Sequence, residues 1–192
     1  QQEDCLTLNV AAPIGAKKLP VMVIIHGGGM IAGSGEYNFA LAPMLNAEGI
    51  VLVTINYRLG SLGFFAHPQL DGSQGVNFGL MDMLASLRWI NRNIAAFGGD
   101  PKQVTITGVS AGALAVNMLM ANPASADLIA GGIAQSGYGT WPLQPRTEHV
   151  TPLKNAPSAE SIALQLASQA TGKPSHKLKR KDLYAVTAAQ WT

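Results

Sequence analysis

The 192-residue sequence contains a single cysteine, Cys5, and few charged residues. One cysteine cannot form a bridge within these residues, and a lone cysteine in so apolar a sequence is usually a small buried hydrophobic residue. Charged residues make up 12% of the chain and apolar residues 47%, a composition that argues against disorder and predicts a globular domain with a sizeable core. No apolar run is as long as a membrane-spanning helix, and no basic segment followed by an apolar one precedes Gln1. We therefore expect no membrane span, and any targeting segment would lie outside these residues.

Motifs for several other chemistries are also missing. The sequence has no cluster of Cys and His with metal-ligand spacing, no phosphate-binding Gly-Lys-Ser/Thr loop and no internal repeat, so we predict neither a metal site nor a cofactor. The net charge of +2 arises near the C-terminus, because residues 173–192 carry 5 basic against 1 acidic side chain, whereas residues 1–172 carry 8 against 10. No aromatic residues interleave the basic cluster at 177–181, which is typical of a solvated helix start and predicts no nucleic-acid partner.

The most informative stretch is residues 104–113, a short β-like run that breaks at Gly-Val-Ser-Ala-Gly and continues into an apolar helical pattern. This is the sequence form of a nucleophile elbow, in which a serine occupies a strained turn between a strand and a helix. Such a turn requires residues with almost no side chain two positions before and after the serine, and Gly108 and Gly112 meet that requirement. Ser110 is therefore the candidate nucleophile, at the carboxyl end of a strand.

A second motif follows residues 21–25, a β-branched run typical of a strand buried on both faces. The run ends at His26, and Gly27, Gly28 and Gly29 come next. Three successive glycines cost backbone entropy, so this loop must present N–H groups or allow a close approach of backbone. In α/β hydrolases such a loop supplies donors to the oxyanion hole. The alternative is a tight turn that binds nothing.

The remaining pattern alternates strands and helices, which predicts an α/β fold with a parallel sheet. An alternating strand at 6–10 is expected to start the sheet in a hairpin-like edge, and a long helix should end at Gly98. Further strands are expected at 50–57, from 104 and at 128–135, and helices at 41–47, 80–97, 113–121, 158–170 and 181–189, with Ser158 as a helix cap.

Taken together, these residues resemble the type-B carboxylesterases, the cholinesterase-like branch of the α/β hydrolases. The matching stretches are residues 3–10, 26–29, 56–60, 79–82, 87–90, 93–101 and 135–137, besides the elbow. The resemblance covers residues 1–141 of the expected domain, and residues 142–192 form a loosely similar helical segment. It implies an α/β-hydrolase fold with a mostly parallel sheet and a nucleophile elbow, with N-terminal and C-terminal parts of the domain absent.

The resemblance also implies roles for individual residues in a serine carboxylic-ester hydrolase. Ser110 would be the nucleophile, and the N–H groups of Gly28, Gly29 and Ala111 would form the oxyanion hole. Trp141 would line the acyl side of the substrate pocket. Val109 stands immediately before the nucleophile, where the family usually has a glutamate, and would also line the substrate pocket.

Four further residues receive supporting roles from the same resemblance. Arg58 and Asp82 are expected to form a structural ion pair. His26 would shape the glycine loop, and Ser136 would be a buried serine that supports the site.

The acid and histidine of the triad are not evident in this chain. In this fold they follow the serine in the order acid, then histidine, and the resemblance implies that both lie beyond Thr192, with more chain ahead of Gln1. The remainder of the domain would then be needed for activity, and Cys5 would pair with an upstream cysteine. We expect a small-molecule ester as substrate and a secreted or periplasmic location.

Two alternatives remain open. A small complete hydrolase could use Asp127 or Glu148 together with His149 or His176. A non-catalytic binding or adhesion domain of the same fold is the other, although such domains lose the serine or the glycine loop, and this sequence keeps both.

Overall fold

The computed structural model describes residues 4–70, 77–137 and 157–191. Its centre is a five-stranded sheet in the order β1-β3-β2-β4-β5, in which β1 runs antiparallel to β3 and all other neighbours are parallel. The strands are β1 (Leu8–Ala11), β2 (Leu19–Ile25), β3 (Val51–Ile55), β4 (Gly99–Val109) and β5 (Gly131–Gln135). The predicted α/β class with a mostly parallel sheet is confirmed.

Strands β2 and β3 are largely buried because their sequences are almost entirely β-branched or aliphatic. Every residue of β3 is buried, and β2 pairs with both β3 and β4, so that Ile25 lies between Ile55 and Gly108. The expectation of a hairpin at the start of the sheet is wrong. β1 is an edge strand as expected, but it pairs with β3, because both edges of β2 are already occupied by parallel neighbours.

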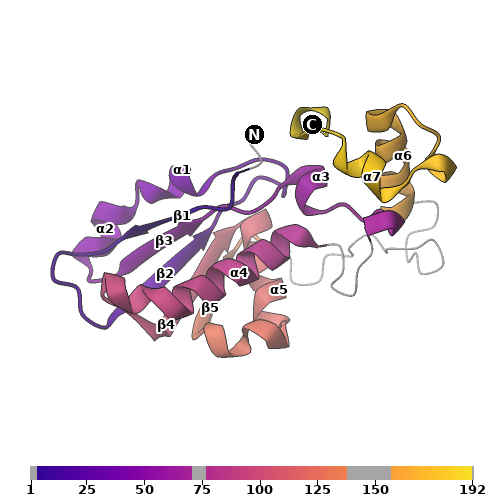
Figure 1. Ribbon diagram of the computed structural model, residues 1–192. Coiled ribbons are helices and arrows are strands. Elements are labelled where there is room, and N and C mark those ends of the chain that lie inside the picture. The colour runs from indigo at the N-terminus through magenta and orange to yellow at the C-terminus, as the bar shows by residue number, and fades with distance from the viewer. Residues whose placement is uncertain (1–3, 71–76, 138–156, 192) are drawn as a thin grey trace.

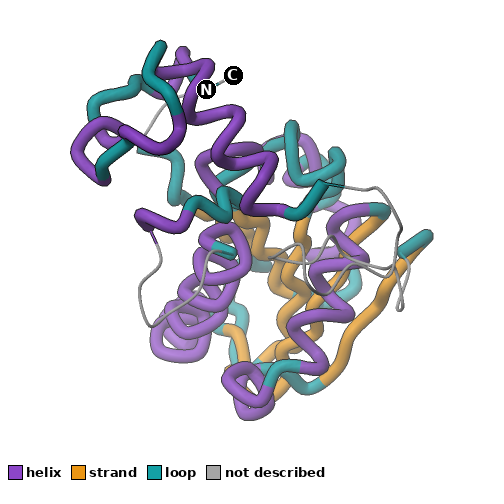
Figure 2. The backbone as a smooth tube through the Cα atoms, turned by 90° about the vertical axis from the view of Figure 1, so that its right-hand side faces the viewer, coloured by secondary structure: helices purple, strands orange, loops and turns teal. Residues whose placement is uncertain are grey.

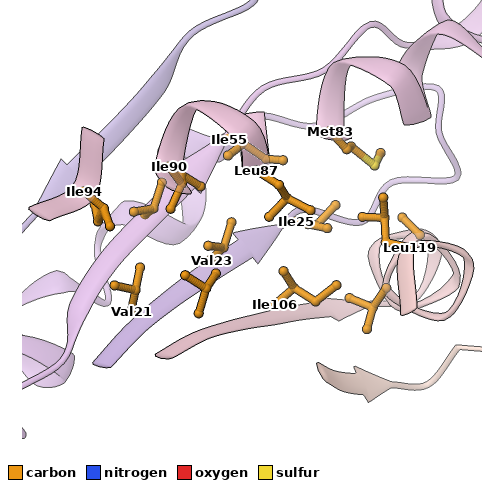
Figure 3. Packing of buried hydrophobic residues seen from close by; sticks show 14 of the residues in the cluster. Val21, Val23, Ile25, Ile55, Met83, Leu87, Ile90, Ile94, Ile106 and Leu119 are labelled. Carbon is orange, nitrogen blue, oxygen red and sulfur yellow. The ribbon is translucent and has the colours of Figure 1, made fainter. Parts of the chain in front are cut away.

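Helices cover both faces of the sheet (Figure 1). The short helices α1 (Gly35–Phe39) and α2 (Ala42–Ala47) lie over one face, where Ala42 meets Ile24 and Leu52. The longer helices α4 (Phe78–Asn93) and α5 (Ala111–Ala121) lie over the other. Figure 3 shows the main core, in which side chains of β2 and β4 meet α4 and α5.

The predicted helix at 80–97 is present, but its last four residues form a 3-10 turn and not an α-helical one. After α4 the chain forms a 3-10 turn, Ile94–Phe97, and the turn ends at Gly98 with φ 82°. This is the left-handed cap that glycine favours. β4 then begins at Gly99, five residues earlier than the sequence suggested, and other 3-10 turns occupy Pro68–Leu70 and Pro123–Leu128.

The C-terminal helices are α6 (Ala159–Thr171) and α7 (Arg180–Tyr184), with 3-10 turns at Ser175–Lys177 and Ala188–Gln190. They group at one end of the molecule beside α3 (Gly60–Gly63) and cover neither face of the sheet (Figures 1 and 2). Ser158 caps α6 as predicted, whereas the helix expected at 181–189 is shorter. In the part of the chain that the structure describes, no helix has the length and apolarity to cross a membrane.

Candidate active site

Ser110 stands at the junction of β4 and α5 in a strained backbone conformation. Its φ is 56° and its ψ is −120°, a region that a residue with a Cβ rarely adopts, at a cost of about 1–3 kcal/mol. The surroundings hold it there, because its N–H donates to Gln135 O at 2.9 Å and its carbonyl accepts from Leu114 N at 3.0 Å. The side chain is exposed and does not cap the helix. The turn therefore exposes the Ser110 hydroxyl at the carboxyl end of the sheet, with no hydrogen-bond partner among residues 4–70, 77–137 and 157–191.

The glycines on either side of Ser110 are required by close backbone contact. A Cβ on Gly108 would collide with the backbone of Gly112, and a Cβ on Gly112 would collide with Ile25 O at the end of β2. The chain can therefore turn from strand to helix at this angle only if both positions lack side chains. This is the physical reason for the spacing that the sequence displays.

The glycine loop, residues 26–33, begins directly at the end of β2, next to Ser110. A Cβ placed on Gly27 would lie 3.6 Å from Ser110 Cβ, so the start of the loop runs close beside the serine. Gly28 and Gly29 have φ values of 108° and 64°, which glycine tolerates best. The Gly28 carbonyl accepts from the N–H groups of Ile31 and Ala32, both at 3.0 Å, which closes the loop on itself.

Three backbone N–H groups near the serine have no acceptor among the described residues. Those of Gly28 and Gly29 take part in none of the hydrogen bonds within residues 4–70, 77–137 and 157–191. The N–H of Ala111 belongs to the first turn of α5, where a helix leaves its N–H groups unbonded and carries a partial positive charge. These groups are the ones that the sequence predicted as oxyanion donors.

His26 is buried inside the loop rather than exposed beside Ser110. Its Nδ1 lies 2.8 Å from Gly27 O, and its ring stacks on Tyr57 with centroids 4.4 Å apart. Burial lowers the pKa of His26, so the ring is neutral at neutral pH. These contacts agree with the predicted loop-shaping role.

The Arg58–Asp82 ion pair is present as predicted, with Arg58 Nη2 2.8 Å from Asp82 Oδ1. The bond to Asp82 is the main reason that the pKa of Arg58 is raised. Cys5 is a half-buried free thiol, and partial burial raises its pKa. Cys5 is therefore less buried than the small buried hydrophobic residue expected from the sequence.

Other predicted site residues are placed differently. Val109 is 51% exposed and directly precedes Ser110, and its role in a substrate pocket stays a prediction. Ser136 is exposed, so its expected burial is wrong in the described part of the chain, where β5 is the outermost strand. Asp127 and His176 are exposed, and no histidine in the described ranges hydrogen-bonds to Ser110. Trp141, Glu148 and His149 lie outside the described residues.

An apolar cavity of about 520 Å³ opens beside the glycine loop, and the sequence did not reveal it. No charged side chain lines it, and its exposed apolar members Ile31, Ile162 and Leu166 come from the loop and from α6. Gly29 also lines it, so the cavity adjoins the candidate oxyanion donors. The only local signal was the spacing of Ile162 and Leu166, one helical turn apart on α6.

Comparison with known proteins places these features in a family. The sequence model of the carboxylesterase family matches residues 1–192. The chain belongs to the carboxylesterase family. It is 45% identical over 152 residues to the fumonisin B1 esterase of Sphingopyxis macrogoltabida, which covers 76% of this chain and 28% of that protein. It is 40% identical over 201 residues to the bile salt-activated lipase of Mus musculus, which covers 98% of this chain and 32% of that protein.

Solved structures agree on the fold. A thermophilic PNB esterase superposes on 100% of this chain and 37% of its own, with a TM-score of 0.81 and 36% identity. A carboxylesterase of Geobacillus stearothermophilus superposes on 99% of this chain and 39% of its own, with a TM-score of 0.79 and 34% identity. The family member described here therefore has the α/β-hydrolase fold, and it spans about a third of the length of the relatives it matches.

Proposed function

We propose that the protein hydrolyses carboxylic esters by acyl transfer, with Ser110 as the nucleophile. The observation that carries the proposal is the backbone of Ser110, whose φ of 56° directs an exposed, uncapped hydroxyl out of the β4–α5 junction. Oγ attacks the ester carbonyl carbon while a general base takes its proton, and the alcohol then leaves as the tetrahedral intermediate collapses. Water attacks the resulting acyl-serine and releases the acid.

The negative charge that forms on the carbonyl oxygen requires donors in place before the reaction. We assign this role to the N–H groups of Gly28, Gly29 and Ala111, which have no acceptor among the described residues. Removing one such donor typically lowers kcat by about 10²–10³-fold. This chemistry requires neither a metal ion nor an organic cofactor.

The general base and its acid partner are proposed to come from the remainder of the hydrolase domain. Support comes from coverage, since the chain spans 28% and 32% of the two curated relatives named above. The alternative base His176 has less support, because it is exposed on the C-terminal helices and does not bond to Ser110. The secreted or periplasmic location stays a prediction.

The apolar cavity beside Gly29 suggests the kind of ester. A cavity of about 520 Å³ falls in the range of small-molecule sites, and one without charged lining residues favours an uncharged, apolar group. We propose that an apolar part of the substrate lies there while its carbonyl faces the glycine loop. Val109 and Trp141 would contact the substrate nearer to the serine.

The test is covalent labelling of the protein produced from its complete reading frame. A phosphonate ester should attach to Ser110, and Ser110→Ala should lose labelling and lower ester turnover by roughly 10³-fold or more. Ser175→Ala, which changes an exposed serine of the C-terminal segment, is the control and should retain both. Labelling of another residue, or turnover that survives Ser110→Ala, would contradict the proposal. A protein that neither reacts nor turns over esters would favour the binding-domain alternative.

A further inference from the structure

No side chain of the segment of residues 56–60, which follows β3 directly, takes part in the bond-making steps proposed above, although Leu59 and Gly60 line the apolar cavity. Two of its residues hydrogen-bond to the glycine loop. The Tyr57 hydroxyl donates to His26 O at 2.8 Å, and the Gly60 N–H donates to Met30 O at 2.7 Å. The first bond lies just before Gly28 and Gly29 and the second just after them. The 56–60 segment therefore holds the glycine loop on both sides of its candidate oxyanion donors.

The same segment is also fixed to the rest of the fold, through hydrogen bonds of Asn56 to Thr7 and to Gly35 and of Arg58 to Asp82. Asn56 Oδ1 accepts from the Gly35 N–H at 2.8 Å, where the chain leaves the glycine loop and enters α1. Arg58 donates three hydrogen bonds to Asp82 of α4, from its backbone N at 3.0 Å and from Nε and Nη2 at 2.8 Å each. Bidentate pairing of this kind restricts the orientation of both groups. The 56–60 segment thus links the glycine loop to α4.

Tyr57 makes the closest contact with the loop. Its side chain and that of His26 are 2% and 5% exposed, and the two rings stack at an interplanar angle of 15°. Burial raises the pKa of Tyr57 to about 12, so its hydroxyl remains a donor at neutral pH. His26 Nδ1 faces Gly27 O, and a carbonyl only accepts, so Nδ1 carries the proton of the neutral ring.

The backbone of Met30 shows that the glycine loop is held in a conformation that this residue disfavours. Its φ is 59°, a left-handed value that is uncommon for a residue with a side chain. Such a conformation persists where surrounding contacts fix it, and the bond from Gly60 to Met30 O is one such contact. A loop left to itself would relax this residue and would shift its neighbour Gly29.

We propose that the 56–60 segment holds the glycine loop in the shape that presents the Gly28 and Gly29 N–H groups to the oxyanion, with Tyr57 as a positioning residue. The inference rests on the proposed function, since it assigns a support to the loop that would act there. The Tyr57 hydroxyl fixes the position of the His26 carbonyl. The positions of the Gly28 and Gly29 N–H groups depend on it, because these residues follow His26 closely in the chain. A positioning role of this kind affects the transition state, in which the oxyanion exists, far more than substrate binding.

The test is Tyr57→Phe, which keeps the stacked ring and removes the hydroxyl, in the protein produced from its complete reading frame. We expect kcat to fall by roughly 10–100-fold with KM within about twofold of wild type, because donors are displaced and not deleted. Affinity for an aryl trifluoromethyl ketone, which forms an oxyanion on the serine, should fall by a similar factor. Tyr37→Phe changes a 79% exposed tyrosine and should alter neither quantity.

Each outcome separates this inference from the proposed function. An active wild type whose kcat and ketone affinity are unchanged in Tyr57→Phe overturns the positioning role alone. A wild type that Ser110 labelling shows to be inert overturns both. A loss of activity that disappears when kcat is expressed per labelled serine means that Tyr57 only stabilises the fold, and also overturns the role. If Tyr57→Phe does not fold, Asn56→Ala should lower kcat by roughly 3–10-fold, and an unchanged kcat there is equally decisive against it.

Discussion

The sheet and the C-terminal helices bury their side chains on very different scales. The core between the sheet and the helices α4 and α5 contains sixteen buried residues, mostly Val, Ile and Leu. The cluster that joins the C-terminal helices to Phe65 contains five, of which two are alanines. Since apolar burial is the main stabilising contribution to folding, stability should be concentrated in the sheet. The C-terminal helices depend more on local features such as helix caps and on a few contacts near Phe65.

The largest effect is expected where the sheet carries the candidate nucleophile. In Gly112→Ala the new Cβ would collide with Ile25 O, a backbone atom of a central strand that cannot move aside. We expect a loss of roughly 3 kcal/mol or more in the free energy of unfolding and a loss of Ser110 labelling. Urea unfolding measures the loss of stability, and reaction with a phosphonate ester measures the loss of Ser110 labelling.

The matched control is Gly131→Ala in the neighbouring strand β5. A Cβ there would lie 3.8 Å from Thr105 Oγ1, an ordinary contact, so labelling should be retained. If Gly112→Ala were as well tolerated as Gly131→Ala, the requirement for glycine at the junction of β4 and α5 would be disproved.

The contrast in burial can be measured directly with one substitution made in each region. Leu87 of α4 is 1% exposed and Leu183 of α7 is 4% exposed, so each loses a buried side chain on replacement by alanine. We expect Leu87→Ala to cost about 3–5 kcal/mol and Leu183→Ala about 2 kcal/mol, because a short surface helix can relax around the gap. Hydrogen exchange should show that the second variant loosens α6 and α7 only. Loss of protection in the sheet as well as in α6 and α7 in Leu183→Ala would mean that the two regions unfold as one unit.

A smaller effect is expected at the N-terminal end of α6. Ser158 Oγ accepts from the Ser161 N–H at 3.1 Å and so caps the helix. Ser158→Ala should cost about 1 kcal/mol, whereas Ser158→Asp should retain most of the cap. Amide exchange in the first turn of α6 is the measurement, and identical protection in the Ala and Asp variants would rule out the cap as a contributor.

The smallest effect is a pH dependence at the contact between the C-terminal helices and residues 65–70. His67 is 1% exposed and stacks on Phe65, and its Nε2 has no partner among the described residues. Burial lowers the pKa of His67, with Glu160 opposing the shift. Below about pH 6.5 the unfolded chain therefore binds a proton before the folded one, so stability falls as the pH drops toward the folded pKa.

Replacing His67 should remove part of this dependence. We expect the difference in urea midpoint between pH 7.5 and pH 5 to shrink in His67→Phe. It should not vanish, because burial lowers the pKa of His26 in the same direction. A full-size difference in His67→Phe would show that His67 does not contribute.

The sequence predicted the features that depend on local backbone demands. The glycines around Ser110 and after His26 occupy positions where a Cβ would collide or where φ is positive. The positions of these glycines in the sequence were therefore enough to predict the two turns. The buried strand β3 and the Ser158 cap were likewise readable from a few adjacent residues.

Features that join distant segments could not be predicted in this way. The partner of β1 depends on the order of the whole sheet, and the exposure of Ser136 depends on what covers β5. The apolar cavity exists only where the glycine loop, the residues after β3 and α6 come together. The hydroxyl of Tyr57 meets the carbonyl of His26 across 31 positions of sequence, so no local pattern marks the pair.

The backbone of Ser110 has a consequence for how substitutions are selected at this position. Glycine adopts a φ near 56° without steric cost, so Ser110→Gly should relieve strain and make the folded protein more stable while removing the hydroxyl. Selection for stability alone would thus favour replacing this serine. A serine that destabilises the fold at this position is retained only if selection for something other than stability acts on it. The strained φ of Ser110 is therefore evidence of such selection that can be obtained from one structure.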